Sequence, residues 1–148
     1  MAEVKTTSSF SRLFLDTCVL IYFLEGHDIY GPPAKRIFEK VESGRVTADI
    51  SVLTLTVLLT GPYLLNDDHL ALKYHALLYH FPHLKIQDIN LDIAVEAARI
   101  RSSYDIAIPD SLLLAAALHT GVDAFITNDQ GLMKFPELEV LDLRHGGL

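Results

Sequence analysis

The chain has 148 residues, of which 50% are hydrophobic and 21% charged, so its composition excludes extensive disorder and fits one domain with a sizeable core. The single cysteine, Cys18, excludes a disulfide framework and a cysteine-based zinc finger. A net charge of −7 would repel nucleic acid, so such a partner would need a local basic patch or bridging metal ions. Because no apolar run reaches ~18 residues and the start MAEVKTTSSFSR is polar, we expect no membrane span, no signal peptide and a cytoplasmic location.

Short apolar runs and helical periodicities alternate along the chain. The apolar runs predict buried strands at residues 13–15, 46–50, 84–87, 124–127 and 139–141. Apolar residues at helical spacing predict helices at residues 17–24, 33–44 and 52–59, a fourth capped by Asn66 or Asp67, a fifth begun by Asn90 or Asp92, and a sixth at 110–119. Asn128-Asp129 is expected to begin a short helix or turn.

Glycine and proline residues mark the expected boundaries of these helices. Gly31-Pro32-Pro33 predicts a break before the second helix, and Gly61-Pro62 is expected to end the third. Short strands separated by helices are typical of an α/β layered structure with a mostly parallel sheet. We therefore expect a single domain over residues 1–148, with a core at about 12–143 and short tails at both ends.

Three aspartates lie where an open parallel sheet places a ligand, outside the carboxyl ends of its strands. Asp16 follows the first strand, Asp129 follows the strand at 124–127 by two residues, and Asp110 lies in the first turn of a helix. Each alone could cap a helix or complement its dipole. Together they provide the separate oxygen ligands that Mg²⁺ or Mn²⁺ requires, so the sequence indicates a divalent-cation site.

Four blocks in this order resemble the motifs of PIN domains, and most of all those of VapC-like toxins of type II toxin–antitoxin pairs. They are LFLDTCVLIYFLE (13–25), DISVLTLTVLLTGP (49–62), IPDSLLLAAAL (108–118) and FITNDQGL (125–132). The resemblance extends from Leu13 to about Leu143. It implies a three-layer α/β/α fold with a central, mostly parallel sheet and the activity of a Mg²⁺- or Mn²⁺-dependent endoribonuclease.

The resemblance also assigns roles to individual positions. It implies that the catalytic, metal-binding acids are Asp16, Asp110 and Asp129. The supporting positions that it implies are Thr17, Thr127 and Asn128, although ordinary helix capping explains the two threonines equally well. The partners that it implies are an RNA substrate, a small cognate antitoxin and a second copy in a homodimer.

Val57 departs from the family pattern S-x-L-T-x-x-E, because valine stands where the second acid belongs. The chain is then a degraded family member, or carries a substitution that silences a nuclease, or uses another acid. The candidate acids are Glu25, Asp49 and Glu42. We expect weakened or silenced cleavage, and the alternative is a catalytically degraded PIN-fold module that binds RNA or a protein.

Cationic residues form two candidate contacts for RNA, although solvated helix faces explain them too. One is Lys35, Arg36 and Lys40; the other is Arg99 and Arg101, of which Arg101 is the candidate contact for RNA or an antitoxin carboxylate. The seven histidines lack an H-E-x-x-H pattern and are interpreted as surface or packing residues. A receiver domain or a haloacid-type phosphatase fits poorly, since Cys18 stands where the latter needs a second aspartate.

Overall fold

A computed structural model describes residues 10–144, so most of the expected tails, including the polar start, lie outside the described residues. The elements in chain order are β1 (Arg12–Leu15), α1 (Thr17–Glu25), α2 (Gly31–Glu42), β2 (Thr47–Ser51), α3 (Val52–Leu64), α4 (Asp68–Tyr79), β3 (Leu84–Gln87), α5 (Leu91–Tyr104), α6 (Ile108–Thr120), β4 (Ala124–Thr127), the 3₁₀ turn η2 (Leu132–Lys134) and β5 (Val140–Asp142). No helix in this part of the chain is long and apolar enough to cross a membrane.

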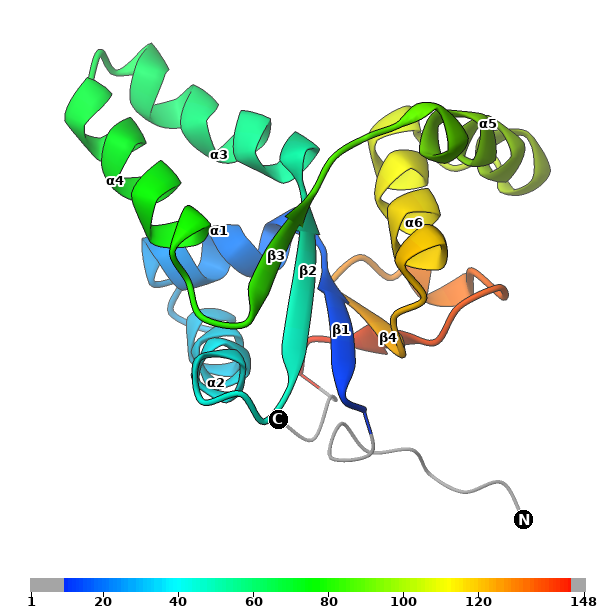
Figure 1. The fold of residues 1–148 in the computed structure, drawn as a ribbon, viewed down its shortest axis with the longest axis horizontal. Helices are drawn as coiled ribbons and strands as arrows, with labels where there is room; N and C mark the ends of the chain where they lie inside the picture. The colour runs from blue at the N-terminus through cyan, green and yellow to red at the C-terminus, as the bar shows by residue number, and fades with distance from the viewer. Residues whose placement is uncertain (1–9, 145–148) are drawn as a thin grey trace.

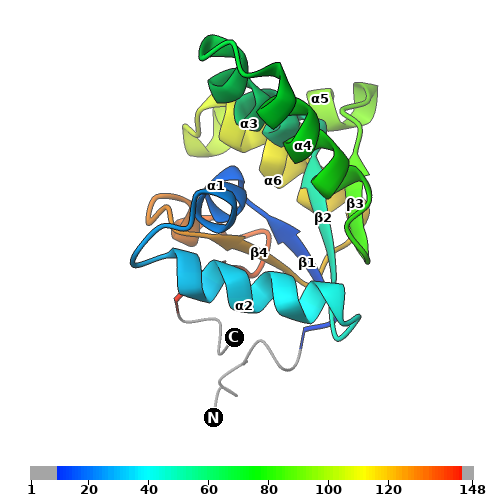
Figure 2. The ribbon, with the colours of Figure 1, turned by 90° about the vertical axis from the view of Figure 1, so that its left-hand side faces the viewer.

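The five strands form one parallel sheet in the order β3-β2-β1-β4-β5. Helices α1 and α2 cover one face and α5 and α6 the other, while the α3–α4 hairpin extends beyond the sheet (Figure 1). Figure 2 shows α2 running beneath α1, with α3 and α4 above. The expected three-layer α/β/α fold is confirmed.

Successive side chains of a strand point to opposite faces of the sheet, and they contribute to two hydrophobic cores, one on each face. Leu13 and Leu15 of β1 pack with α1, α2 and parts of α3 and α4, whereas Phe14 points to the other face and packs with α5 and α6. The Phe14 ring is fully buried and stacks on Phe125 of β4, with 5.8 Å between their centroids. The side chains of two adjacent strands thus hold the sheet to its second helical layer.

Helix α3 continues past Gly61-Pro62 to Leu64, so the prediction that this pair ends the helix is wrong. Gly61 has no Cβ to clash with the following proline ring, which removes the usual obstacle to a helical residue before proline. Pro62 lacks the N–H that would bond to the Leu58 carbonyl, but both side chains are buried. Burial of this apolar segment outweighs the missing hydrogen bond.

Helix α2 begins at Gly31, two residues before the expected start. Pro32 and Pro33 lie in its first turn, where a backbone N–H has no helical partner, so proline costs nothing there. The strands at 84–87 and 124–127 have the expected bounds. The 3₁₀ turn begins at Leu132, three residues after Asp129.

We expect Phe14→Ala to lower the free energy of unfolding by about 3–5 kcal/mol, because it leaves a cavity against Phe125. Urea unfolding followed by circular dichroism measures this. Tyr63→Ala is the control: Tyr63 is 56% exposed, so its removal should change stability by less than about 1 kcal/mol. Equal losses for the two variants would contradict the packing described here.

Candidate active site at the carboxyl edge of the sheet

The sheet has a topological switch point between β1 and β4. From β1 the chain builds outward through β2 and β3, then returns to place β4 on the other side of β1. The connections after β1 and β4 therefore diverge to opposite faces and leave a crevice at the carboxyl ends of these strands. Asp16 follows β1 and Asp129 follows β4, so both lie beside this crevice.

Asp16 is buried and held by two hydrogen bonds. Its Oδ1 accepts from the backbone N–H of Thr17 at 2.7 Å, which caps α1, and its Oδ2 accepts from Thr127 Oγ1 at 2.6 Å. Thr17 Oγ1 in turn lies 2.8 Å from Oγ1 of the buried Thr54 on α3. These contacts tie the first acid to β4 and α3.

Asp129 and Asp110 approach Asp16 from two other elements. The backbone N–H of Asp129 donates to Thr127 Oγ1 at 3.0 Å, and Asp129 Oδ1 accepts from the Gly131 N–H at 2.8 Å. Asp110 lies in the first turn of α6, and its half-buried carboxylate accepts no hydrogen bond from residues 10–144. Asp110 therefore lies within electrostatic range of Asp16 and Asp129.

The pKa directions of these acids show that their charges interact. Burial raises the pKa of Asp16, the hydrogen bonds from Thr127 and Thr17 lower it, and the charge of Asp129 raises it further. Burial also raises the pKa of Asp110, and the charges of Asp16 and Asp129 add to this. The ionised cluster is therefore destabilised unless a cation balances it.

The oxygen donors fit a hard divalent cation in their chemistry, and the unpartnered Asp110 carboxylate is available to one. Within residues 10–144, no three acidic, histidine or cysteine side chains are already close enough to enclose an ion. Asp16, Asp110 and Asp129 would therefore hold Mg²⁺ or Mn²⁺ together with several waters, as Mg²⁺ tolerates.

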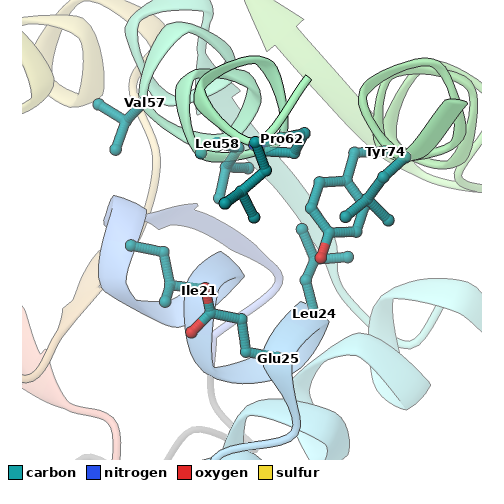
Figure 3. Close-up of a pocket in the computed structure, with 10 residues that line it drawn as sticks. Ile21, Leu24, Glu25, Val57, Leu58, Pro62 and Tyr74 are labelled. Atoms are coloured by element: carbon teal, nitrogen blue, oxygen red, sulfur yellow. The ribbon is translucent and has the colours of Figure 1, made fainter. Parts of the chain in front are cut away.

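Val57 is 46% exposed on α3 and lines an apolar groove of about 200 Å³ between α1 and the α3–α4 hairpin. Figure 3 shows Ile21 and Leu24 of α1 and Tyr74 of α4 in the same groove. Glu25, at the end of α1, also lines this groove, and among residues 10–144 it makes no hydrogen bond or ion pair with Asp16, Asp110 or Asp129.

Neither Asp49 nor Glu42 takes that place. The buried Asp49 carboxylate accepts from Gln87 Nε2 at 2.7 Å and from an Arg12 guanidinium nitrogen at 3.3 Å. These bonds occupy it in the middle of β2. Glu42 is exposed at the end of α2. No candidate replacement is therefore bound into the cluster.

The predicted cationic contacts are only partly available. Arg99 pairs with Glu96 and Glu137, which neutralise it. Arg101 is exposed and donates to the Ile106 carbonyl at 3.1 Å, in the loop that leads to Asp110. Lys35, Arg36 and Lys40 lie on α2, and the last two line an open hollow with Arg45.

Sequence analysis missed two polar partners of the site, Thr54 and Tyr22. Tyr22 Oη accepts from Asn128 Nδ2 at 3.2 Å, a contact between residues 106 positions apart. Tyr22 has no sequence signal of its own, because it lies in an apolar helical segment, whereas Thr54 occupies the threonine of the pattern S-x-L-T-x-x-E. Cys18 donates weakly to Asp16 Oδ2 at 3.8 Å, and burial together with the Asp16 charge raises the pKa of its thiol to about 12.

A family model described as PIN domain matches residues 13–138. The chain belongs to the PIN domain family. Among curated proteins, no sequence matches it significantly.

Solved structures share the fold of this PIN domain. A toxin–antitoxin complex from Klebsiella pneumoniae is 24% identical, with a TM-score of 0.69 over 90% of this chain and 98% of that one. VapBC2 from Rickettsia felis, bound to promoter DNA, is 17% identical, with a TM-score of 0.71 over 88% and 98%. Mycobacterium tuberculosis VapC20, described as a sarcin–ricin loop cleaving toxin, is 16% identical, with a TM-score of 0.66 over 86% and 98%.

Added Mn²⁺ should raise the melting temperature at pH 7.5, by roughly 3–6 °C at about ten times its Kd, because it relieves repulsion among the three carboxylates. Protons compete for these ligands, and the raised pKa values of Asp16 and Asp110 move this competition to higher pH. The shift should therefore shrink already near pH 5. Thermal melts with Mn²⁺ or EDTA at both pH values measure it.

Asp110→Asn should reduce this Mn²⁺-induced shift at pH 7.5, since it removes an anionic ligand. Asp28→Asn, on the exposed loop before α2, is the matched control and should retain the full shift. An equal shift in both variants, or one that is the same at pH 5 and pH 7.5, would contradict the assignment of these carboxylates.

Proposed function

We propose that the chain is a metal-dependent endoribonuclease of the VapC toxin type, weakened or silenced at position 57. The observation that carries this proposal is that the charges of Asp16, Asp110 and Asp129 interact beside the crevice of a PIN fold. The description of VapC20 as a sarcin–ricin loop cleaving toxin supports RNA as the substrate.

Asp16, Asp110 and Asp129 would hold a Mg²⁺ or Mn²⁺ ion, which would supply Lewis-acid stabilisation of the phosphate and a more acidic bound water. Asp16 serves as a fixed ligand, because Thr127 and the Thr17 N–H orient both of its oxygens. Asp110 and Asp129 contribute the remaining negative charge from α6 and from the turn after β4. Arg101 or the cations of α2 would contact the RNA phosphates despite the negative net charge.

The missing acid at Val57 limits this chemistry. A carboxylate there would help to hold the metal or orient the attacking water. Loss of one electrostatic contact of this kind costs about 2–4 kcal/mol of transition-state stabilisation, or roughly a hundredfold or more in rate. The second candidate function, a PIN-fold module that binds RNA or a protein without cleaving it, is favoured by this same residue.

Val57→Glu should increase Mn²⁺-dependent cleavage of a fluorescent single-stranded RNA by about a hundredfold or more, since it restores the family's second acid. Single-turnover rates with Mn²⁺ or EDTA measure this. Val57→Gln is the control, because glutamine has nearly the size of glutamate but no charge. Its cleavage rate should stay close to that of the unsubstituted chain. If Val57→Glu binds Mn²⁺ but remains inactive, the binding-module function is correct instead.

A small antitoxin is the proposed protein partner. Its support is that several solved structures of similar fold are described as toxin–antitoxin or VapBC complexes. The apolar groove at Val57 offers a surface for such a partner. The test is a short reading frame next to this gene, whose product should copurify with the chain when the two are coexpressed.

We also propose a homodimer, supported by large exposed apolar side chains on α5 and α6. Leu91, Val95 and Ile108 are 79%, 63% and 58% exposed. Val95→Glu should lower the mass measured by light scattering from that of a dimer to that of a monomer, while Lys134→Glu should not. A monomeric original chain at about 100 μM would refute the dimer.

A further inference from the structure

The turn that carries Asp129 is held through the residues on both sides of it. Asn128 Nδ2 donates to Tyr22 Oη on α1 at 3.2 Å. Gln130 Nε2 donates to Asp142 Oδ2 on β5 at 3.1 Å. Among residues 10–144, Asp129 itself bonds within the turn and to Thr127, and the two side-chain hydrogen bonds hold its neighbours on either side.

Tyr22 is a rigid support for its side of the turn. Its half-buried ring lies 4.9 Å from the Tyr30 ring and 5.0 Å from the His27 ring, centroid to centroid. His27 is fixed in turn, because its Nδ1 accepts from the backbone N–H groups of Ile29 and Tyr30. The Tyr22 hydroxyl therefore meets Asn128 from a frame with little freedom to move.

The residues that hold the two sides of the turn are also linked to each other, through Arg144. Arg144 donates to Asp142 at 3.3 Å, and its guanidinium lies over the Tyr30 ring, 5.7 Å from the centroid. A chain of side-chain contacts therefore runs from one side of the turn to the other, and we call it the belt. Its members in order are Asn128, Tyr22, Tyr30, Arg144, Asp142 and Gln130.

We propose that Tyr22 is a positioning residue for Asp129, acting through its hydrogen bond with Asn128 to keep that carboxylate in place for a divalent cation. This inference rests on the proposed function. Metal ligands must be held to within about 0.5 Å, and an exposed turn would otherwise lose conformational freedom when the ion binds. Because the belt already orders the turn when the protein folds, metal binding does not have to offset this loss of conformational freedom.

The test is Mn²⁺ affinity, measured by calorimetry in the full chain and again in the Val57→Glu background. Tyr22→Phe removes only the hydroxyl and keeps the ring, so it should raise the Kd for Mn²⁺ by about 3–10-fold, as expected for one lost hydrogen bond. Tyr104→Phe is the matched control. It loses a hydroxyl that bonds to Glu137 away from the site, and should change the Kd less than twofold.

A double-mutant cycle separates positioning from a general loss of stability. Asn128→Ala should weaken Mn²⁺ binding, and adding Tyr22→Phe to it should weaken binding no further. If Tyr22→Phe leaves the Kd unchanged, or if its effect adds fully to that of Asn128→Ala, the inference is wrong while the proposed function stands. If even Val57→Glu binds no Mn²⁺, the proposed function fails and the inference fails with it.

Discussion

A 2.6 Å hydrogen bond from Thr127 to the buried Asp16 joins the ends of β1 and β4, and the geometry of the site depends on it. The same hydroxyl accepts the backbone N–H of Asp129, so one side chain orients both strand-end acids. The sheet order makes this possible, because β4 returns to pair beside β1 after two strands have been added on the other side. Asp110 then needs only the packing of α6 against Phe14 and Phe125 to reach the group.

The sequence was sufficient for most of the architecture, and it singled out the three acids as candidates. Strand positions followed from apolar runs, and the acids from their places after strands and at a helix start. The errors occurred at Gly61-Pro62 and at Gly31, where proline and glycine normally interrupt a helix. In both cases the local preference was overcome, by burial in α3 and by position within the first turn in α2.

The polar contacts around the acids were not predictable in the same way. Tyr22 and Thr54 lie in apolar segments, and each meets its partner only after the layers have packed. Asp49 shows the opposite case. Its sequence position allowed a role at the site, but Arg12 and Gln87 engage it within the sheet. Pairing across strands, which one sequence does not reveal, decides which acids are available.

The side chain at position 57 contributes little to the folding of this protein. Its side chain is half exposed at the border of a groove, and none of the hydrogen bonds that hold Asp16 involves it. Replacing an acid there leaves both cores intact. The architecture therefore does not depend on an acid at position 57, and under the proposed function a weakened nuclease would keep its fold.

The thiol of Cys18 gives the site a chemical property of a different kind. Its pKa of about 12 keeps it protonated at every physiological pH, and only the thiolate reacts readily with peroxides, alkylating agents or disulfides. A sulfur atom that touches Asp16 would otherwise be a point of oxidative damage in the acidic cluster. Burial, together with the charge of Asp16, thus keeps the neighbouring thiol in its less reactive protonated form.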